Sequence, residues 1–220
     1  MIPVSRAFPD TADIAALRPA IEALRAGDAI VYPTETFYAL GVDAMSPRAL
    51  AHLFEIKGRE PGKPVALIAA DLEMALALAS VISGDARRLA DAFWPGPLTL
   101  VLPPRPGLPE DLIGPDGGIG VRVSSHPIAR ALSEALGRPI TATSANLAGE
   151  PPAIDLAGAR RTLGSKVKVF VEGGRLVGGA PSTVISVTPT GIRAIRAGAV
   201  TDDQIKAVLE NRDPHPRDGY

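Results

Sequence analysis

The 220-residue sequence contains no cysteine, which excludes disulfide bonds, thiolate catalysis and cysteine-ligated zinc or iron–sulfur sites. Long apolar runs are missing too. The N-terminal stretch MIPVSRAFPD has no signal-peptide core, and no apolar segment approaches the ~20 residues that a membrane span needs. The formal net charge is only −1, which argues against a broadly basic nucleic-acid-binding surface but not against a local basic pocket. We therefore expect a cytoplasmic protein that makes no membrane contact.

Apolar residues make up 46% of the sequence, which is enough for one sizeable core. Amphipathic helical segments alternate with short apolar strands in the first part of the chain, and strands cluster near its end. This order predicts an α/β fold with one mixed, twisted sheet flanked by helices. We expect a single domain over residues 1–220, with a core at about 12–210 and a polar, disordered tail at 211–220. The expected strands are AIVYP (29–33), VALIA (65–69), LTLVL (98–102), IGVRV (119–123), PITAT (139–143), VKVFV, STVISV and IRAIR.

Common catalytic and cofactor motifs are missing. Gly62-Lys63 is followed by Pro64, and the preceding glycine is one position out of place, so there is no P-loop. No G-x-G-x-x-G follows a strand and no H-E-x-x-H occurs. The three histidines lie far apart, so we expect no protein-built metal site, and His126 before Pro127 fits a helix start better. A Ser-His-Asp triad stays open, although no G-x-S-x-G elbow supports one.

The segment KGREPGKP (57–64) holds three cations, Lys57, Arg59 and Lys63. Its two prolines lack amide donors, which predicts a stiff loop. Each polar loop of this chain, taken alone, is explained by surface charge, capping or turn chemistry. Together their cations, hydroxyls and amide predict a phosphate-binding pocket beyond the ends of the strands. The other polar loops are TETFYALG (34–41), TSANLAGEPP (143–152) and GGAPST (178–183).

Seven blocks of the sequence stand in the order found in the YrdC-like family: IVYPTETFYALGVDA, KGREPGKP, FWPGPLTLVL, GVRVSSHPIA, PITATSANLAGEPP, APSTVISV and IRAGAV. The family signature K-x-R, followed far downstream by S-x-N, is met by Lys57, Arg59, Ser144 and Asn146. Over about residues 12–210 the sequence resembles this family, and in particular its threonylcarbamoyl-AMP synthases in their short bacterial, TsaC-type form. The resemblance implies the YrdC-like fold, with a ligand pocket at the strand ends.

The resemblance also implies a reaction. L-threonine, bicarbonate or CO2, and ATP give threonylcarbamoyl-AMP and pyrophosphate, and Mg2+ would share the work at the phosphates. A downstream tRNA threonylcarbamoyl-transferase machinery then modifies adenosine 37 of tRNAs, and this chain could contact tRNA itself. The nucleophiles come from the substrates, so the protein must supply positioning and positive charge.

Roles for individual residues follow from the same resemblance. The catalytic residues would be Lys57 and Arg59, which offset charge on the departing pyrophosphate. Arg122 is suited to pair with the amino-acid carboxylate. Trp94 is expected in the core or the pocket wall. The implied ATP-binding residues are Lys57, Arg59, Lys63, Ser144, Asn146 and Arg196, and the implied threonine-binding residues are Thr36, Arg122, Ala142 and Ser182.

Three positions depart from the family pattern. Ala39 stands where most synthases have glycine, and we expect a cost if the backbone there needs a positive φ. Glu60 places an acid beside the cationic loop, where proline is usual. Ile68 replaces a histidine that longer members use near threonine, and short members also lack that histidine.

Two alternative functions stay open. A YrdC-like chain could bind structured RNA through its basic pocket, although the net charge of −1 does not favour phosphate contacts along a surface. It could also resemble the carbamoyl-transfer domains embedded in hydrogenase-maturation proteins, but the neighbouring domains of those proteins are missing here.

Overall fold

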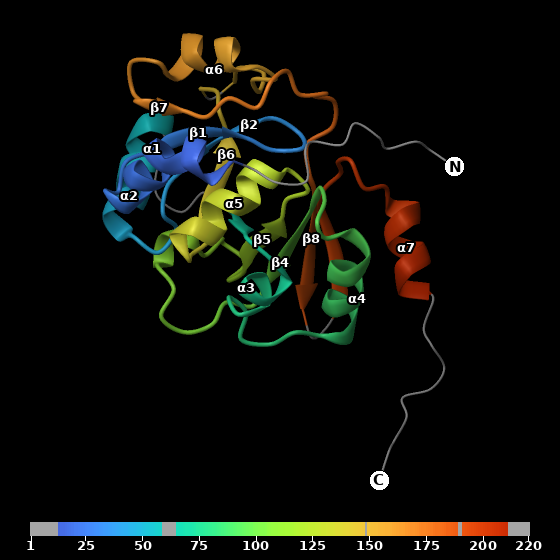
Figure 1. Cartoon of the computed structure of the whole chain (residues 1–220). Helices are drawn as coiled ribbons and strands as arrows, with labels where there is room; N and C mark the ends of the chain where they lie inside the picture. Colours follow the sequence, from blue (N-terminus) through green and yellow to red (C-terminus); the bar gives the residue numbers. More distant parts are fainter. Residues whose placement is uncertain (1–12, 59–64, 148, 189–190, 211–220) are drawn as a thin grey trace.

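The computed structural model of the protein describes residues 13–58, 65–147, 149–188 and 191–210. Within them the chain is built on one nine-stranded sheet in the order β7-β1-β2-β6-β3-β5-β4-β8-β9 (Figure 1). β7 pairs with β1, β3 with β5, and β4 with β8 in parallel, whereas the other neighbours are antiparallel. The mixed α/β sheet expected from the sequence is confirmed. Its strands are β1 (Ile30–Pro33), β2 (Tyr38–Gly41), β3 (Ala66–Ala69), β4 (Leu98–Leu102), β5 (Ile119–Val123), β6 (Ile140–Ser144), β7 (Val169–Phe170), β8 (Thr183–Thr188) and β9 (Gly191–Arg196).

Several helices begin where the sequence marks a cap. The side chains of Ser46, Asp71 and Asp155 each accept the backbone N–H three residues further on. His126 Nδ1 accepts the N–H of Ile128 at 3.3 Å, which confirms that His126 stands at a helix start. In the described parts of the chain, none of the helices is both long enough and apolar enough to cross a membrane. They are α1 (Ile14–Arg25), α2 (Pro47–Lys57), α3 (Leu72–Leu76), α4 (Gly84–Phe93), the 3₁₀ turn η1 (Glu110–Leu112), α5 (Pro127–Leu136), α6 (Leu156–Leu163) and α7 (Asp202–Glu210).

Two of the differences from the expected boundaries bear on the predicted ligand-binding residues. The segment 34–41 is not all loop, because its second half forms β2 and pairs with both β1 and β6. Lys57 is not in the loop but is the last residue of α2, because Gly58 takes a left-handed conformation, with φ of 57°, that caps the helix. Residues 59–64 of the cationic loop and the expected tail at 211–220 lie outside the described residues.

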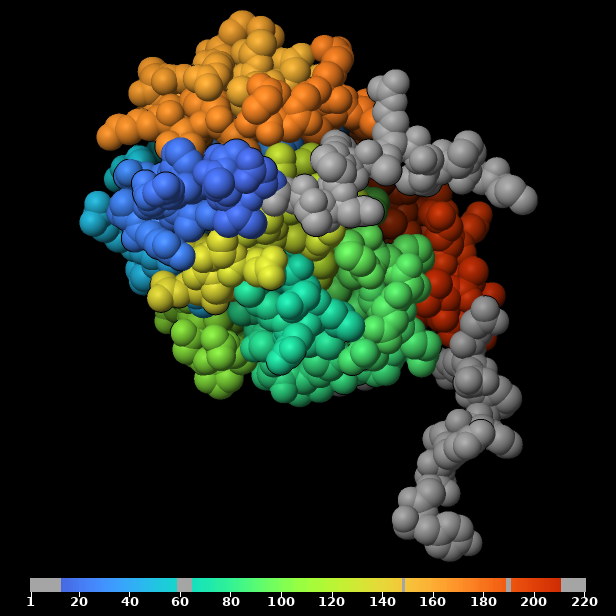
Figure 2. Space-filling model, viewed as in Figure 1, coloured from blue at the N-terminus to red at the C-terminus, as the bar shows by residue number. Residues whose placement is uncertain are grey.

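The core lies on both faces of the sheet, because successive strand residues point to opposite sides. Leu67 and Ala69 of β3 pack in a cluster with residues of α2 and α6, whereas Ile68 between them packs with α1 and α5. A third cluster joins α4 and α7 to β4 and β8. Figure 1 shows α1 beside α5 and α4 beside α7, and in the space-filling view α1, α5 and α3 adjoin and hide the sheet (Figure 2).

Candidate active site

One cavity of about 400 Å³ is lined by residues of β2, β3, β4, β5, β6, β8 and β9 and of nearby loops. It is open because several strand residues that line it are small, namely Ala39, Ala66, Gly120 and Ala142. A Cβ atom on Gly120 would lie only 3.3 Å from Cγ2 of Thr99, so even one more methyl group would crowd the wall. Small side chains thus leave room for a ligand against the sheet.

The cavity gathers most of the residues predicted to bind ligands. Every residue assigned to threonine lines it, and so do Ser144 and Arg196 from the ATP set. Lys57 and Asn146 lie next to it, through contacts with Ser144. Arg59 and Lys63 lie outside the described residues, so their roles stay predictions.

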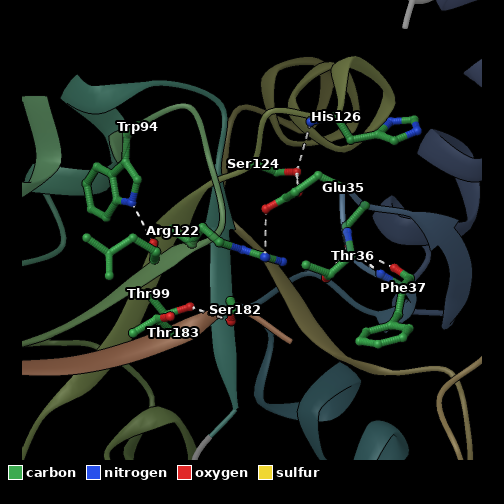
Figure 3. Close-up of polar contacts among 12 residues, drawn as sticks. Glu35, Thr36, Phe37, Trp94, Thr99, Arg122, Ser124, His126, Ser182 and Thr183 are labelled. Carbon is green, nitrogen blue, oxygen red and sulfur yellow. Dashed lines mark hydrogen bonds and ion pairs between the residues drawn. The ribbon is translucent and has the colours of Figure 1, made fainter. Parts of the chain in front are cut away.

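Arg122 reaches the cavity from β5 and is almost wholly buried. Its Nη1 donates to Oε1 of Glu35 at 2.8 Å, in an ion pair whose side chains are 6% and 9% exposed. The second carboxylate oxygen of Glu35 accepts a hydrogen bond from Ser124 Oγ. Figure 3 shows the Arg122 side chain between Glu35 on one side and the Thr99–Ser182 pair on the other. Arg122 Nε is shielded from solvent and has no hydrogen-bond partner within the described residues, so part of the hydrogen-bonding capacity of this guanidinium is unused.

A second guanidinium, that of Arg196, shares this cavity. Its Nη2 donates to the carbonyl oxygen of Ser182 at 2.7 Å and to Ser182 Oγ at 2.9 Å. Ser182 Oγ also lies 3.1 Å from Oγ1 of Thr99. Burial lowers the pKa of Arg196, and the positive charge of Arg122 lowers this pKa further. Two cations that repel each other across a cavity favour an anionic ligand between them.

The loop between β1 and β2 adds hydroxyl groups. Thr34 Oγ1 donates to the carbonyl oxygen of Phe37 at 2.7 Å and lies 3.2 Å from Oγ1 of Thr36. Because the Thr34 hydroxyl proton is already used, Thr36 donates in the second pair. Thr36 Oγ1 can therefore accept a hydrogen bond from a ligand.

Lys57 is buried at the end of α2, where its ammonium group holds the loop after β6. Nζ donates to the carbonyl oxygens of Ser144 at 2.7 Å and Asn146 at 2.5 Å, and to Asn146 Oδ1 at 3.1 Å. Asn146 Oδ1 also accepts from Ser144 Oγ at 2.5 Å, and Asn146 Nδ2 donates to the carbonyl oxygen of Glu150 at 2.5 Å. The K-x-R and S-x-N blocks are therefore joined by direct contacts, although they are far apart in the sequence.

Comparison with known proteins agrees with this architecture. The family model Sua5_yciO_yrdC, described as telomere recombination, matches residues 22–198. The chain belongs to the Sua5/YciO/YrdC family.

Its relatives in this family differ in length. The threonylcarbamoyl-AMP synthase of Alkalilimnicola ehrlichii is 40% identical over 187 residues, which cover 84% of this chain and 93% of that protein. The threonylcarbamoyl-AMP synthase of Pyrococcus abyssi is 36% identical over 200 residues, which cover 91% of this chain but only 59% of the relative. The chain thus spans less than two thirds of that longer protein.

Solved structures of the Sua5/YciO/YrdC family share the fold. The crystal structure of P. abyssi Sua5 complexed with L-threonine matches with a TM-score of 0.84 and 36% identity, over 88% of this chain and 57% of that one. The crystal structure of E. coli YciO matches with a TM-score of 0.80 and 33% identity, over 90% of this chain and 96% of that one. The YrdC-like fold expected from the sequence is therefore confirmed.

The departures from the family pattern have different structural consequences. The expected cost of Ala39 does not arise, because every positive φ among the described residues belongs to a glycine. Ala39 lies in β2, and its side chain lines the cavity instead. Ile68 is fully buried and packs in the cluster beneath α1 and α5. Glu60 lies outside the described residues.

Sequence reasoning missed three polar residues of this family's cavity region. Glu35 holds Arg122, Ser124 holds Glu35, and Thr99 contacts Ser182. Glu35 and Ser124 stand inside two of the family blocks. The sequence signal that could have found them is a carboxylate next to Thr36 and a hydroxyl close to Arg122. Thr99 alternates with apolar residues in β4, and its pattern is that of an ordinary strand.

Proposed function

We propose that this protein condenses L-threonine, bicarbonate or CO2, and ATP into threonylcarbamoyl-AMP and pyrophosphate, the first step of threonylcarbamoyl-adenosine formation at position 37 of tRNAs. The observation that carries the proposal is the cavity in which two guanidinium groups and several hydroxyls face one space. Relatives with 36% and 40% identity bear the name threonylcarbamoyl-AMP synthase. A structure of the same fold is a complex with L-threonine.

The threonine end of the cavity is assigned to Arg122, Thr36, Ser182 and Ala142. The guanidinium of Arg122, which lines the cavity, suits a carboxylate, because an ionised acceptor pairs best with a buried cationic donor. The free lone pair of Thr36 Oγ1 suits the amino group. Ser182 Oγ and the backbone near Ala142 line the same space and complete this end.

The nucleotide end is assigned to Arg196, Ser144 and Asn146, with Arg59 and Lys63 on the phosphates. The ammonium of Lys57 is engaged with the loop at 144–146, so in this proposal Lys57 positions that loop and acts on the nucleotide through it. The positive charges of Arg196 and the cationic loop would stabilise negative charge on the departing pyrophosphate.

The chemistry requires no protein nucleophile. The threonine amine attacks CO2 and loses a proton to form a carbamate, and a carbamate oxygen then attacks the α-phosphorus of ATP, so that the bond to pyrophosphate breaks. The protein contributes position and charge. The described residues include no group of three or more histidine or acidic side chains that could hold a metal ion, so Mg2+ enters this proposal as the counter-ion of ATP.

The product would pass to a separate tRNA threonylcarbamoyl-transferase machinery in the cytoplasm. The step proposed here requires no tRNA contact by this chain, which keeps it distinct from the RNA-binding alternative.

Pyrophosphate release tests the proposal. Purified protein with ATP should release pyrophosphate only when L-threonine and bicarbonate are both present. Release that needs neither, or no release under any combination, would refute the synthase proposal, and a gel-shift assay with structured RNA would then test the RNA-binding alternative.

A further inference from the structure

Glu35 is a buried carboxylate beside the cavity whose role the proposed reaction leaves open. It lies between Thr34 and Thr36 in the loop that joins β1 to β2. Its side chain is 9% exposed, and it is not among the residues that line the cavity. Both of its oxygens are engaged, Oε1 by Arg122 Nη1 and Oε2 by Ser124 Oγ (Figure 3). Its sequence neighbours Thr34 and Thr36 line the cavity, whereas the Glu35 side chain reaches it through Arg122.

The contact with Glu35 engages one nitrogen of the Arg122 guanidinium, which also lines the cavity. Glu35 Oε1 accepts a hydrogen bond from Nη1 at 2.8 Å. Nε is shielded from solvent and has no partner in the part of the chain that the structure describes. A guanidinium carries five N–H donors in a fixed planar fork, so a single contact to Glu35 does not use up its capacity for a carboxylate. A ligand carboxylate can therefore pair with the cavity side of Arg122 without displacing Glu35.

Glu35 is itself held from the start of α5. Ser124 is fully buried, and its Oγ accepts the backbone N–H of His126 at 3.1 Å while it donates to Glu35. Arg130 Nη1, one turn into α5, donates to the carbonyl oxygen of Ser124 at 2.7 Å. The Glu35 carboxylate is thus held, through Ser124, by the N-terminal end of α5.

We propose that Glu35 is a positioning residue for amino-acid binding, which holds the Arg122 guanidinium so that its cavity side meets the substrate carboxylate. Glu35 also balances the charge of Arg122 before substrate arrives, since a buried guanidinium without a counter-charge is costly. The identity of the ligand rests on the proposed function, but the role of Glu35 is separable from the chemistry that follows binding.

The test compares three variants by calorimetric titration with L-threonine and by pyrophosphate release. In E35A the guanidinium loses its anchor, and we expect the Kd and KM for threonine to rise at least ~10-fold, the scale of one charge-assisted hydrogen bond. The KM for ATP should stay within about twofold, because the nucleotide end does not use Glu35. E35Q keeps an acceptor for Nη1 and should bind threonine within about threefold of wild type. S124A removes the hydrogen bond to Glu35 Oε2, together with the one that Ser124 Oγ accepts from His126 N–H, and should weaken threonine binding by about threefold.

The outcomes separate this inference from the proposed function. If E35A binds threonine as wild type does, or if its KM values for threonine and ATP rise in parallel, Glu35 is not a positioning residue for the amino acid. If E35A does not fold, the titration of S124A with threonine becomes the test. Unchanged threonine binding in S124A would then overturn the inference. If the wild-type protein bound threonine but released no pyrophosphate, the proposed function would be wrong. The same threonine titrations would still test the role of Glu35.

Discussion

Replacing Lys57 with methionine tests whether this residue acts by holding the loop at 144–146. Within the part of the chain that the structure describes, the buried ammonium donates to the carbonyl oxygens of Ser144 and Asn146 and to Asn146 Oδ1. Of these, the Ser144 carbonyl oxygen keeps a hydrogen bond from the backbone N–H of Asn146, and Asn146 Oδ1 keeps Ser144 Oγ. K57M therefore leaves the Asn146 carbonyl oxygen without its lysine donor and weakens two further contacts.

The magnitude follows from these contacts. A buried acceptor without a donor costs ~1–3 kcal/mol, and the weakened contacts add to this cost. Removing the ammonium also removes the cost of its desolvation, which offsets part of the loss of stability. We expect K57M to lower the free energy of unfolding by about 2–3 kcal/mol, or about 1 M in the urea midpoint for a protein of this size.

Urea unfolding without ligands, followed by the fluorescence of Trp94, the sole tryptophan, measures this change. K206M replaces an exposed lysine of α7 and serves as the control, with an expected change within about 0.5 kcal/mol. If K57M unfolded at the wild-type midpoint and yet lost all turnover, the ammonium would act on the substrate rather than on the loop, and the reasoning would be refuted.

Three further predictions concern the sheet, the pH dependence and substrate choice. G41A should lower the free energy of unfolding by at least ~2 kcal/mol, since its Cβ would lie 2.6 Å from the carbonyl oxygen of Thr141. A39G in the same strand should cost only ~0.5–1 kcal/mol, and equal urea midpoints for the two variants would contradict this. Burial and the charge of Arg130 lower the pKa of His126 from 6.5 to about 4. Between these pH values only the unfolded chain binds the proton, so the free energy of unfolding should fall by up to ~3 kcal/mol as pH drops through the window. H126N keeps a capping side chain and should flatten this profile in urea titrations, and an unchanged profile would exclude His126. Turnover should follow the order threonine, serine, valine, because a missing methyl group costs ~1–3 kcal/mol whereas a missing hydroxyl leaves buried partners unpaired. Faster pyrophosphate release with valine than with serine would mean an apolar pocket.

The strands and helices of this protein were largely predictable from local patterns. Apolar runs such as LTLVL and IGVRV correspond to β4 and β5, and capping residues mark the starts of α2 and α5. β2 was not predicted, because it follows a turn-rich stretch and forms by pairing with β1 and β6. β6 lies about a hundred residues downstream. The order of the strands was not predictable, since neighbours such as β3 and β6 meet only through long-range pairing.

Part of the membership of the candidate site was predictable, but its internal contacts were not. The family blocks pointed to six of the residues that line the cavity, namely Thr36, Arg122, Ala142, Ser144, Ser182 and Arg196. The engagement of Lys57 with the loop at 144–146 depends on Gly58 ending α2 at that point. The pairing of Glu35 with Arg122 joins residues 87 positions apart, and no local pattern marks a carboxylate as the partner of a distant arginine.

The most direct test of the central claim is detection of the product itself. The protein is incubated with ATP, L-threonine and isotope-labelled bicarbonate, and the mixture is analysed at once by mass spectrometry. The account predicts a threonylcarbamoyl-AMP species that carries the label of bicarbonate, in amounts equal to the pyrophosphate released. Pyrophosphate release without a labelled adenylate, or an adenylate that contains no carbon from bicarbonate, would contradict it.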